Sequence, residues 1–260
     1  MVKATANLVP HGGSGWHVPR RSGGMAVSLP SRVTPSFGPS ADAPTSPPTS
    51  KHRSSAHSLF EAVRHEGEAE LARPLKSLWW SGVAAGLAMA TSLLGEAIVE
   101  RSLPAHASYA ASLSAVGYSL GFLIVVLGHL QLFTENTITT LLPVLRRRTW
   151  SCVASMLRLW SVVFLANLVG AGLAGWTLSS GTVGPSLLAT MEHIAERATA
   201  ADFGTNFLRA IPAGFMVAAI VWLTRLEKPT RFWVIVVLTW AIAAGGFSHV
   251  IVGSVEVFLL

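Results

Sequence analysis

The sequence is poor in charged residues. Asp, Glu, Lys and Arg make up only 12% of its 260 residues, whereas hydrophobic residues make up 51% and the mean hydropathy is +0.51. A soluble domain usually carries about 25% charged residues. The deficit therefore argues against a soluble protein and indicates a polytopic membrane protein.

Cysteine is almost absent too. The single Cys152 excludes an intrachain disulfide framework and a metal site built from several cysteines, and we interpret it as a small packing residue. The chain also has no HExxH motif and no paired-carboxylate spacing. A membrane-embedded enzyme needs a convergent nucleophile or metal set. We therefore predict that the chain is not an enzyme, with no catalytic residue, no metal and no cofactor.

The basic excess has a topological explanation. The net charge of +6 and the pI near 10.2 are compatible with nucleic-acid binding, but the basic residues flank apolar runs, so we predict no nucleic-acid partner. By the positive-inside rule they predict a cytoplasmic N-terminus. We expect an integral protein of the bacterial inner (plasma) membrane. The basic groups are Lys51, Arg53, Arg64, Arg73 and Lys76, then 146–148, then Arg225, Lys228 and Arg231.

Three regions follow from composition. Residues 1–57 are rich in Pro, Ser and Gly and predict a disordered tail. Residues 58–76 predict an amphipathic surface helix, and Pro74 marks a turn into the first span. Residues 77–260 predict a transmembrane channel domain with five apolar spans, at about 77–99, 113–145, 150–178, 206–224 and 232–260.

Two of these spans are interrupted by polar residues. The second run is too long for one upright helix and holds "GHLQLFTENT", which predicts a broken helix with an irregular loop near Phe133–Asn136. The fifth holds "GGFSHVIVGS" at 245–254. Matching interruptions in two halves of a chain indicate a permeation site between inverted repeats.

The last span raises a question of completeness. It is still apolar at Leu260, with no polar residue to mark the membrane interface. The pattern calls for a sixth span, so we expect a C-terminally truncated architecture.

Four motifs resemble the formate/nitrite transporter family, in the family's order. They are "LFT" in the second span, "ANLVGAGLAG" (166–175), "FMVAAIVWLT" (215–224) and "GFSHVIVGSVEVF" (246–258). The resemblance covers about residues 58–260. It implies an all-α polytopic membrane protein with an aquaporin-like inverted-repeat bundle, spans two and five broken, assembled as a homopentamer in the lipid bilayer. Each protomer would carry its own pore for a small monovalent anion such as formate, nitrite or hydrosulfide.

The resemblance also implies roles for individual residues. His249 would be the central pore histidine, and Thr134, within Phe133–Asn136, would belong to the family's omega-loop site. The cytoplasm-side constriction would be formed by Phe133 and Phe122, with Tyr118 nearby and Ile242 across from them.

Four further polar residues in the spans need an interpretation. Glu135 either stabilises the loop or lies near the substrate, and both alternatives stay open. A carboxylate on an anion path repels its substrate, so we interpret Glu256 as a contact that stabilises the fold. Asn167 is expected to bond between helices, and His129 to pack.

A weak acid crosses an apolar constriction more cheaply as the neutral molecule than as the anion. Histidine is suited to protonate it, since its ordinary pKa is about 6.5. We therefore expect transport of small anions or weak acids with His249 as proton or hydrogen-bond donor. Two alternatives stay open: a proton-coupled secondary transporter, and a non-conducting or truncated membrane subunit of the same fold.

Overall fold

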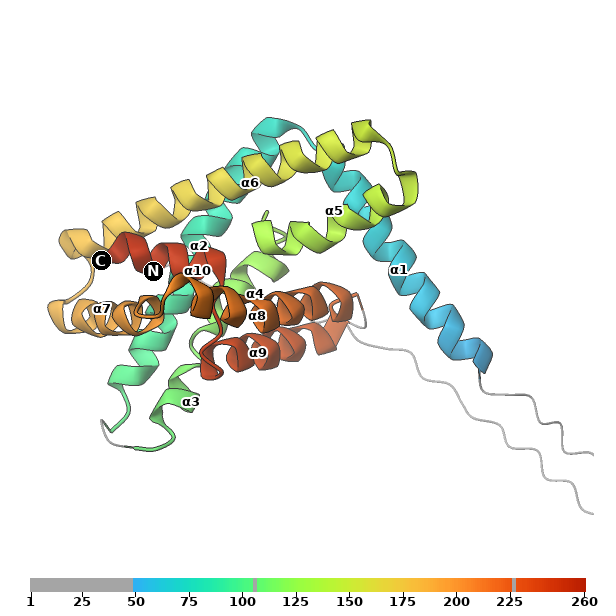
Figure 1. Ribbon diagram of the computed structural model, residues 1–260. Coiled ribbons are helices and arrows are strands. Elements are labelled where there is room, and N and C mark those ends of the chain that lie inside the picture. Colours follow the sequence, from blue (N-terminus) through green and yellow to red (C-terminus); the bar gives the residue numbers. More distant parts are fainter. Residues whose placement is uncertain (1–48, 105–106, 226–227) are drawn as a thin grey trace, which may run out of the picture. The chain divides into compact units, whose positions relative to one another are not determined.

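The computed structural model describes residues 49–104, 107–225 and 228–260. Every regular element in these ranges is a helix, so the predicted all-α class is confirmed (Figure 1). Most of the predicted tail lies outside the described residues. The elements are α1 (Thr49–Leu71), α2 (Leu75–Arg101), α3 (Ala110–Ser114), α4 (Ser119–Leu127), α5 (Phe133–Arg147), α6 (Trp150–Thr177), the π-helical turn η1 (Leu178–Thr182), α7 (Pro185–Thr199), α8 (Phe203–Leu223), α9 (Lys228–Ala244) and α10 (Val250–Leu259).

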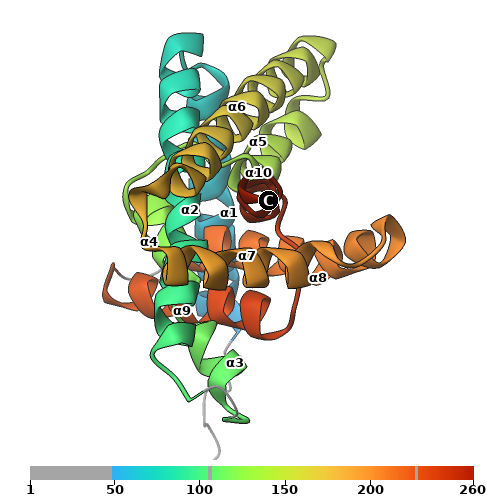
Figure 2. The same ribbon diagram turned by 90° about the vertical axis from the view of Figure 1, so that its left-hand side faces the viewer.

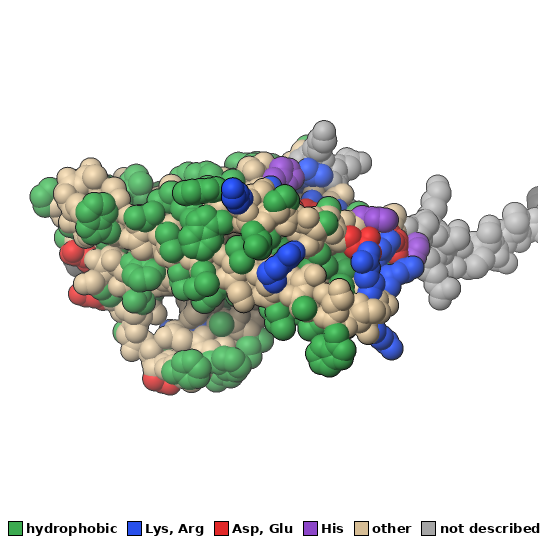
Figure 3. Space-filling model, turned by 90° about the horizontal axis from the view of Figure 1, so that it is seen from above, with side chains coloured by type: hydrophobic (Ala, Val, Ile, Leu, Met, Phe, Trp, Pro, Cys, Tyr) green, Lys and Arg blue, Asp and Glu red, His purple; other side chains and the backbone are tan. Residues whose placement is uncertain are grey.

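The helices correspond to the five apolar runs. Helices α2, α6 and α8 form the first, third and fourth runs, and each is long and apolar enough to cross a membrane, as is the stretch Ala110–Leu127. The second run consists of α3, α4 and α5, and the fifth consists of the shorter helices α9 and α10. Hydrophobic side chains cover much of the face in Figure 3, while Lys and Arg gather toward one end together with Glu and His.

The surface helix is longer than the sequence predicts. It begins at Thr49, nine residues before the predicted start, so the predicted boundary at residue 58 is wrong. The added residues are mostly polar and carry no apolar period, which is why composition assigned them to the tail. The predicted turn at Pro74 is present, since Pro74 is the N-cap of α2 and cannot donate into the preceding helix.

Helix α7 was not foreseen from sequence. Its first residue is Pro185, the favoured type at that position. Its buried face carries Met191, Ile194 and Ala195, and Glu192, Glu196 and Arg197 gave it the appearance of a polar connection. It packs against α2 and α10, and Figure 2 shows α10 end-on among α2, α6 and α7.

Glycines allow α2 and α6 to pack closely. A Cβ atom on Gly86 would overlap the Asn167 carbonyl oxygen, and one on Gly170 would overlap the Val83 carbonyl oxygen. Small residues at such positions permit backbone contact between membrane helices. This pair of helices therefore forms a rigid frame beside the two interrupted spans.

Candidate permeation site

The first interruption lies between α4 and α5. The irregular residues are Gly128–Leu132, and Phe133–Asn136 form the first turn of α5. The predicted loop at Phe133–Asn136 is therefore wrong by about one turn. His129 adopts a left-handed conformation with φ of 51°, which reverses the chain direction where α4 ends.

Asn167 of α6 satisfies the backbone of this break. Its Nδ2 donates to the carbonyl oxygens of Gly82, at 2.8 Å, and Gln131, at 2.9 Å. Its Oδ1 accepts from the Phe133 N–H group, the first of α5, at 2.9 Å. Irregular backbone at membrane depth needs such partners, so this fully buried side chain bonds the break to two neighbouring helices.

The second interruption lies between α9 and α10. Gly246 has φ of 61°, and the Ser248 hydroxyl donates to Asn206 Oδ1 of α8 at 2.9 Å. His249 is the N-cap of α10, and its Nδ1 accepts from the Val252 N–H at 3.4 Å. An imidazole that accepts at Nδ1 carries its proton on Nε2, so Nε2 is left to donate.

The two breaks meet at one pair of side chains. His249 Nε2 lies 3.0 Å from Oγ1 of Thr134, the second residue of α5. His249 stands at the N-terminus of α10, so the N-termini of two half-helices converge here. Helix N-termini carry a partial positive charge and favour anions.

An apolar cluster lies against this pair. The Phe122 and His249 rings meet in an edge-type contact with centroids 5.0 Å apart, and the Tyr118 and Phe122 ring centroids lie 5.5 Å apart. Ile242 is fully buried in the same cluster, and the partly buried Phe133 packs against the cluster. The structure thus brings together all four apolar residues that the sequence singled out.

A cavity of about 590 Å³ opens on one side of His249. We call it the α7-side cavity, because Ile194, Arg197 and Thr199 of α7 contribute to its wall. His249, Tyr118, Glu96 and Glu256 also line it. Tyr118 therefore both contacts Phe122 and lines the α7-side cavity.

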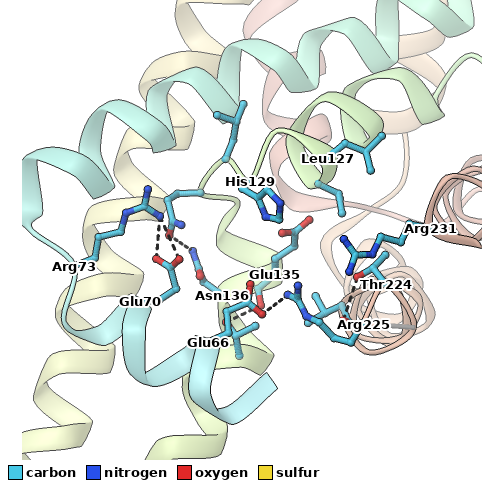
Figure 4. A pocket seen from close by; sticks show the side chains of 15 residues that line it. Glu66, Glu70, Arg73, Leu127, His129, Glu135, Asn136, Thr224, Arg225 and Arg231 are labelled. Carbon is cyan, nitrogen blue, oxygen red and sulfur yellow. Dashed lines mark hydrogen bonds and ion pairs between the residues drawn. The ribbon is translucent and has the colours of Figure 1, made fainter. Parts of the chain in front are cut away.

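A smaller cavity of about 170 Å³ lies beside α1, and we call it the α1-side cavity (Figure 4). Its wall combines acidic and basic groups with apolar residues of α4. Arg225 forms an ion pair with Glu66 of α1, and Nε of Arg231 is buried without a hydrogen bond. No described residue lines both cavities, and the apolar cluster adjoins each of them: Tyr118 and Val252 line the α7-side cavity, and Val126 and Leu130, which pack against the cluster, line the α1-side cavity.

The remaining candidate residues divide between bonded and free groups. Asn136 is buried and donates to Gln131 Oε1 at 2.9 Å. Glu135 points into the α1-side cavity, and its Oε1 has no hydrogen-bond partner among the described residues, which disfavours a loop-stabilising role (Figure 4). His129 is exposed on the wall of that cavity, so the expected packing role is wrong.

Ion pairs join α1 to the end of α5. Arg64 bonds Glu61 at 2.6 Å and Glu68 at 2.7 Å, and Glu68 also receives Arg147 at 3.1 Å. The hydrogen bond from Arg64 keeps the pKa of Glu61 below its ordinary value. Arg147 is exposed, and an exposed ion pair of this kind contributes little to the free energy of unfolding.

Comparison with known proteins identifies the family. The model of the family described as "Formate/nitrite transporter" matches residues 57–260. The chain belongs to the formate/nitrite transporter family. It is 36% identical over 208 residues to the inner membrane protein YfdC of Escherichia coli (strain K12), covering 80% of this chain and 67% of the relative. It is 30% identical over 143 residues to the formate channel FocA of Haemophilus influenzae, covering 51% of this chain and 48% of the relative.

Two solved structures share the fold of this transporter-family chain. One is a pentameric formate channel with formate bound, with a TM-score of 0.60 and 19% identity over 70% of this chain and 72% of the other. The second is an FNT family ion channel, with a TM-score of 0.64 and 18% identity over 80% and 82%. The chain is thus an integral membrane protein with the bundle fold of the formate/nitrite transporters.

Some residues of this family member's site escaped the sequence interpretation. Gln131, Asn206 and Ser248 fasten the two breaks, and Arg225 and Arg231 line the α1-side cavity. Only their place beside the interruptions could have identified them. No group of three or more His, Cys, Asp or Glu side chains in the described ranges could hold a metal ion.

Proposed function

We propose that the chain carries small monovalent anions of weak acids, of the size of formate or nitrite, across a membrane through a pore in each protomer. One observation carries the proposal: the N-termini of α5 and α10 converge on the Thr134–His249 pair, between two cavities that each adjoin an apolar cluster. The name of the Haemophilus relative, a formate channel, supports this class of substrate.

The electrostatics of the pair favour an anion. Two helix N-termini and an Nε2–H donor face the same point, and Thr134 supplies a hydroxyl group that can donate or accept. An anion that reaches His249 from the α7-side cavity replaces part of its hydration with these donors.

The apolar cluster then favours neutral passage. Beyond the pair, the path meets Phe122 and Phe133, which offer an anion no donor. Removing the charge lowers the cost of leaving water, so the acid crosses as the protonated molecule and releases its proton beyond the cluster. His249 donates the proton or a strong hydrogen bond to the anion at this step.

Orientation and assembly form the second part of the proposal. By the positive-inside rule, the basic residues near α1, at the end of α5 and at Arg225 favour a cytoplasmic position for the α1-side cavity. The inner-membrane name of the Escherichia coli relative supports the bacterial inner membrane. The pentameric structural relative supports a homopentamer.

The first experiment replaces the histidine. In liposomes that contain the purified full chain, His249→Phe lowers formate uptake by about 100-fold, because a positioned proton donor contributes that much to a rate. His193→Phe on the exposed part of α7 is the matched control and keeps wild-type uptake. Equal pH-dependent uptake by His249→Phe and the wild type contradicts the role of His249. No uptake of formate or nitrite by the wild type contradicts transport and favours a non-conducting subunit.

A further inference from the structure

A second ionisable group shares the α7-side cavity with His249. Glu256 lies on the same face of α10, seven residues after His249, and both side chains line the cavity. A Cβ atom on Gly253 would lie 3.8 Å from Glu256 Oε2, so the carboxyl group lies back along the helix, toward the His249 end.

Glu256 has no bonding role in the fold. Its exposed fraction is 8%, yet its carboxyl group makes no hydrogen bond or ion pair within the described ranges. The sequence led us to expect a stabilising contact, and the structure offers no partner for one. A buried carboxyl group without a partner is costly when charged, and natural proteins keep such groups chiefly at functional sites.

The groups around Glu256 do not neutralise it. Helix α2, which packs against α10, presents Glu96, a second carboxyl group, to the same cavity. Arg197 of α7 is already bonded to Glu100 at 2.9 Å. Helix α6 packs against α10 and contributes no ionisable side chain to the cavity wall. The titratable and charged groups that face Glu256 across the cavity are Glu96, Tyr118, Arg197, Arg209 and His249.

We propose that Glu256 is the proton-loading group of the transport path on the α7 side. This inference rests on the transport function proposed above and makes that transport proton-coupled. The protonated carboxyl group of Glu256 gives up its O–H proton, and the new O–H bond forms on the oxygen of the incoming anion beside His249. The neutral acid then leaves, and the Glu256 carboxylate takes a new proton from the water of the cavity.

Electrostatics couple the entry of the anion to the protonation of Glu256. A neutral Glu256 admits an anion to the cavity, whereas a charged Glu256 beside Glu96 repels the next one until it is protonated again. One proton therefore accompanies each anion. A carboxyl group on an anion path is thus compatible with transport when it carries a proton during entry.

The experiment uses the full chain in liposomes, with formate as the probe and a pH-sensitive dye in the lumen. In the wild type, formate uptake rises as the pH falls from 8 to 5, by at most about 10-fold per pH unit, and one proton enters with each formate. Glu256→Gln keeps the shape but cannot release a proton, so the rise shrinks to about two-fold over the whole range and proton entry falls below formate entry. Glu196→Gln, on the exposed part of α7 and outside the cavity, keeps both wild-type values.

A second variant keeps the test decisive if Glu256→Gln fails to assemble. Glu96→Gln removes the neighbouring negative charge, so the midpoint of the rate–pH curve moves to lower pH by about half a unit. A wild-type pH curve and proton ratio in an assembled Glu256→Gln variant overturns the inference, as does an unmoved midpoint in Glu96→Gln. Absence of formate flux in the wild type overturns the proposed function as well, so the two failures are distinguishable.

Discussion

At the scale of single residues, the structure gives several polar side chains one defined task at a helix end. His249 caps α10 through Nδ1 and thereby leaves Nε2 for Thr134. Asp202 caps α8, where Oδ1 accepts from the Gly204 N–H at 2.9 Å and Oδ2 accepts from the Thr205 hydroxyl at 2.6 Å. The first cap leaves a donor beside Thr134, and the second cap lies at the start of an apolar helix long enough to cross a membrane.

The Asp202 cap predicts a pH dependence of stability. Hydrogen bonds, first of all from the Thr205 hydroxyl, keep the pKa of Asp202 below its ordinary value of 3.8. A lowered folded-state pKa means that the charged cap stabilises the fold above about pH 3.8 and loses this effect as the pH falls through the folded value. Asp202→Asn should therefore melt below the wild type at pH 7, and the difference should vanish in strong acid.

Thermal melting in detergent across this pH range tests the cap. Glu196→Gln, an exposed charge removal on the preceding helix, should leave the melting temperature unchanged at both ends of the range. A constant difference between Asp202→Asn and the wild type, from neutral to acid pH, would show that the Asp202 charge is not the cause.

At the scale of elements, the two interrupted spans depend on helices that are themselves continuous. In the closely packed pair of α2 and α6, Asn167 of α6 bonds to the backbone of Gln131 and Phe133 at the first break and also to the Gly82 carbonyl oxygen of α2. Asn206 of α8 holds the second break, because its Oδ1 accepts a hydrogen bond from the Ser248 hydroxyl in that break. An interrupted helix in a membrane is stable only because neighbouring helices satisfy the backbone groups that it exposes.

Asn167 therefore carries a large share of the stability of the first break. Asn167→Leu leaves one N–H group and two carbonyl groups without their partner, at a cost of at least about 3 kcal/mol in the free energy of unfolding. We expect a clear fall in melting temperature and loss of formate uptake. Leu165→Ala, on the exposed face of the same helix, is the control and should melt close to the wild type. Wild-type stability of Asn167→Leu would mean that water replaces all three bonds.

At the scale of the whole molecule, large apolar side chains remain on the surface of the single protomer. Trp80 is 69% exposed, Trp150 87%, Phe203 86% and Phe215 76%. Soluble proteins rarely expose apolar patches of large size, and these exposed side chains agree with an integral membrane protein. The separate cavities lie inside the protomer, which is consistent with one pore in each chain.

The proposed assembly has a simple expected mass. Native mass spectrometry of the purified full chain should give a particle of five 27.5 kDa subunits, apart from bound lipid and detergent. The mass should not change in His249→Phe or Glu256→Gln, since neither residue lies on the exposed surface. A monomer that still transports formate would contradict the proposed pentamer but not the proposed pore in each protomer.

Much of the element order was predictable, and the errors have physical causes. Long apolar runs identified α2, α6 and α8, because a span has a minimum length set by the bilayer. The start of α1 and the whole of α7 were missed, since polar helices on a membrane protein resemble connections in composition. The break was placed at Phe133 instead of Gly128–Leu132, because Thr, Glu and Asn suit a helix start as well as a loop.

The chain's composition and apolar periodicity alone establish a helical membrane protein with two interrupted spans, because the bilayer imposes length and polarity on every segment that crosses it. Family resemblance marked His249 and Thr134 as a site, but their separation of 3.0 Å exists only through the packing of two half-helices 115 residues apart in sequence. The role of Glu256 likewise depends on the tertiary structure. Whether a buried carboxyl group is bonded or free is decided by neighbours from α2, α7 and α8, and no local pattern in the sequence of α10 encodes them.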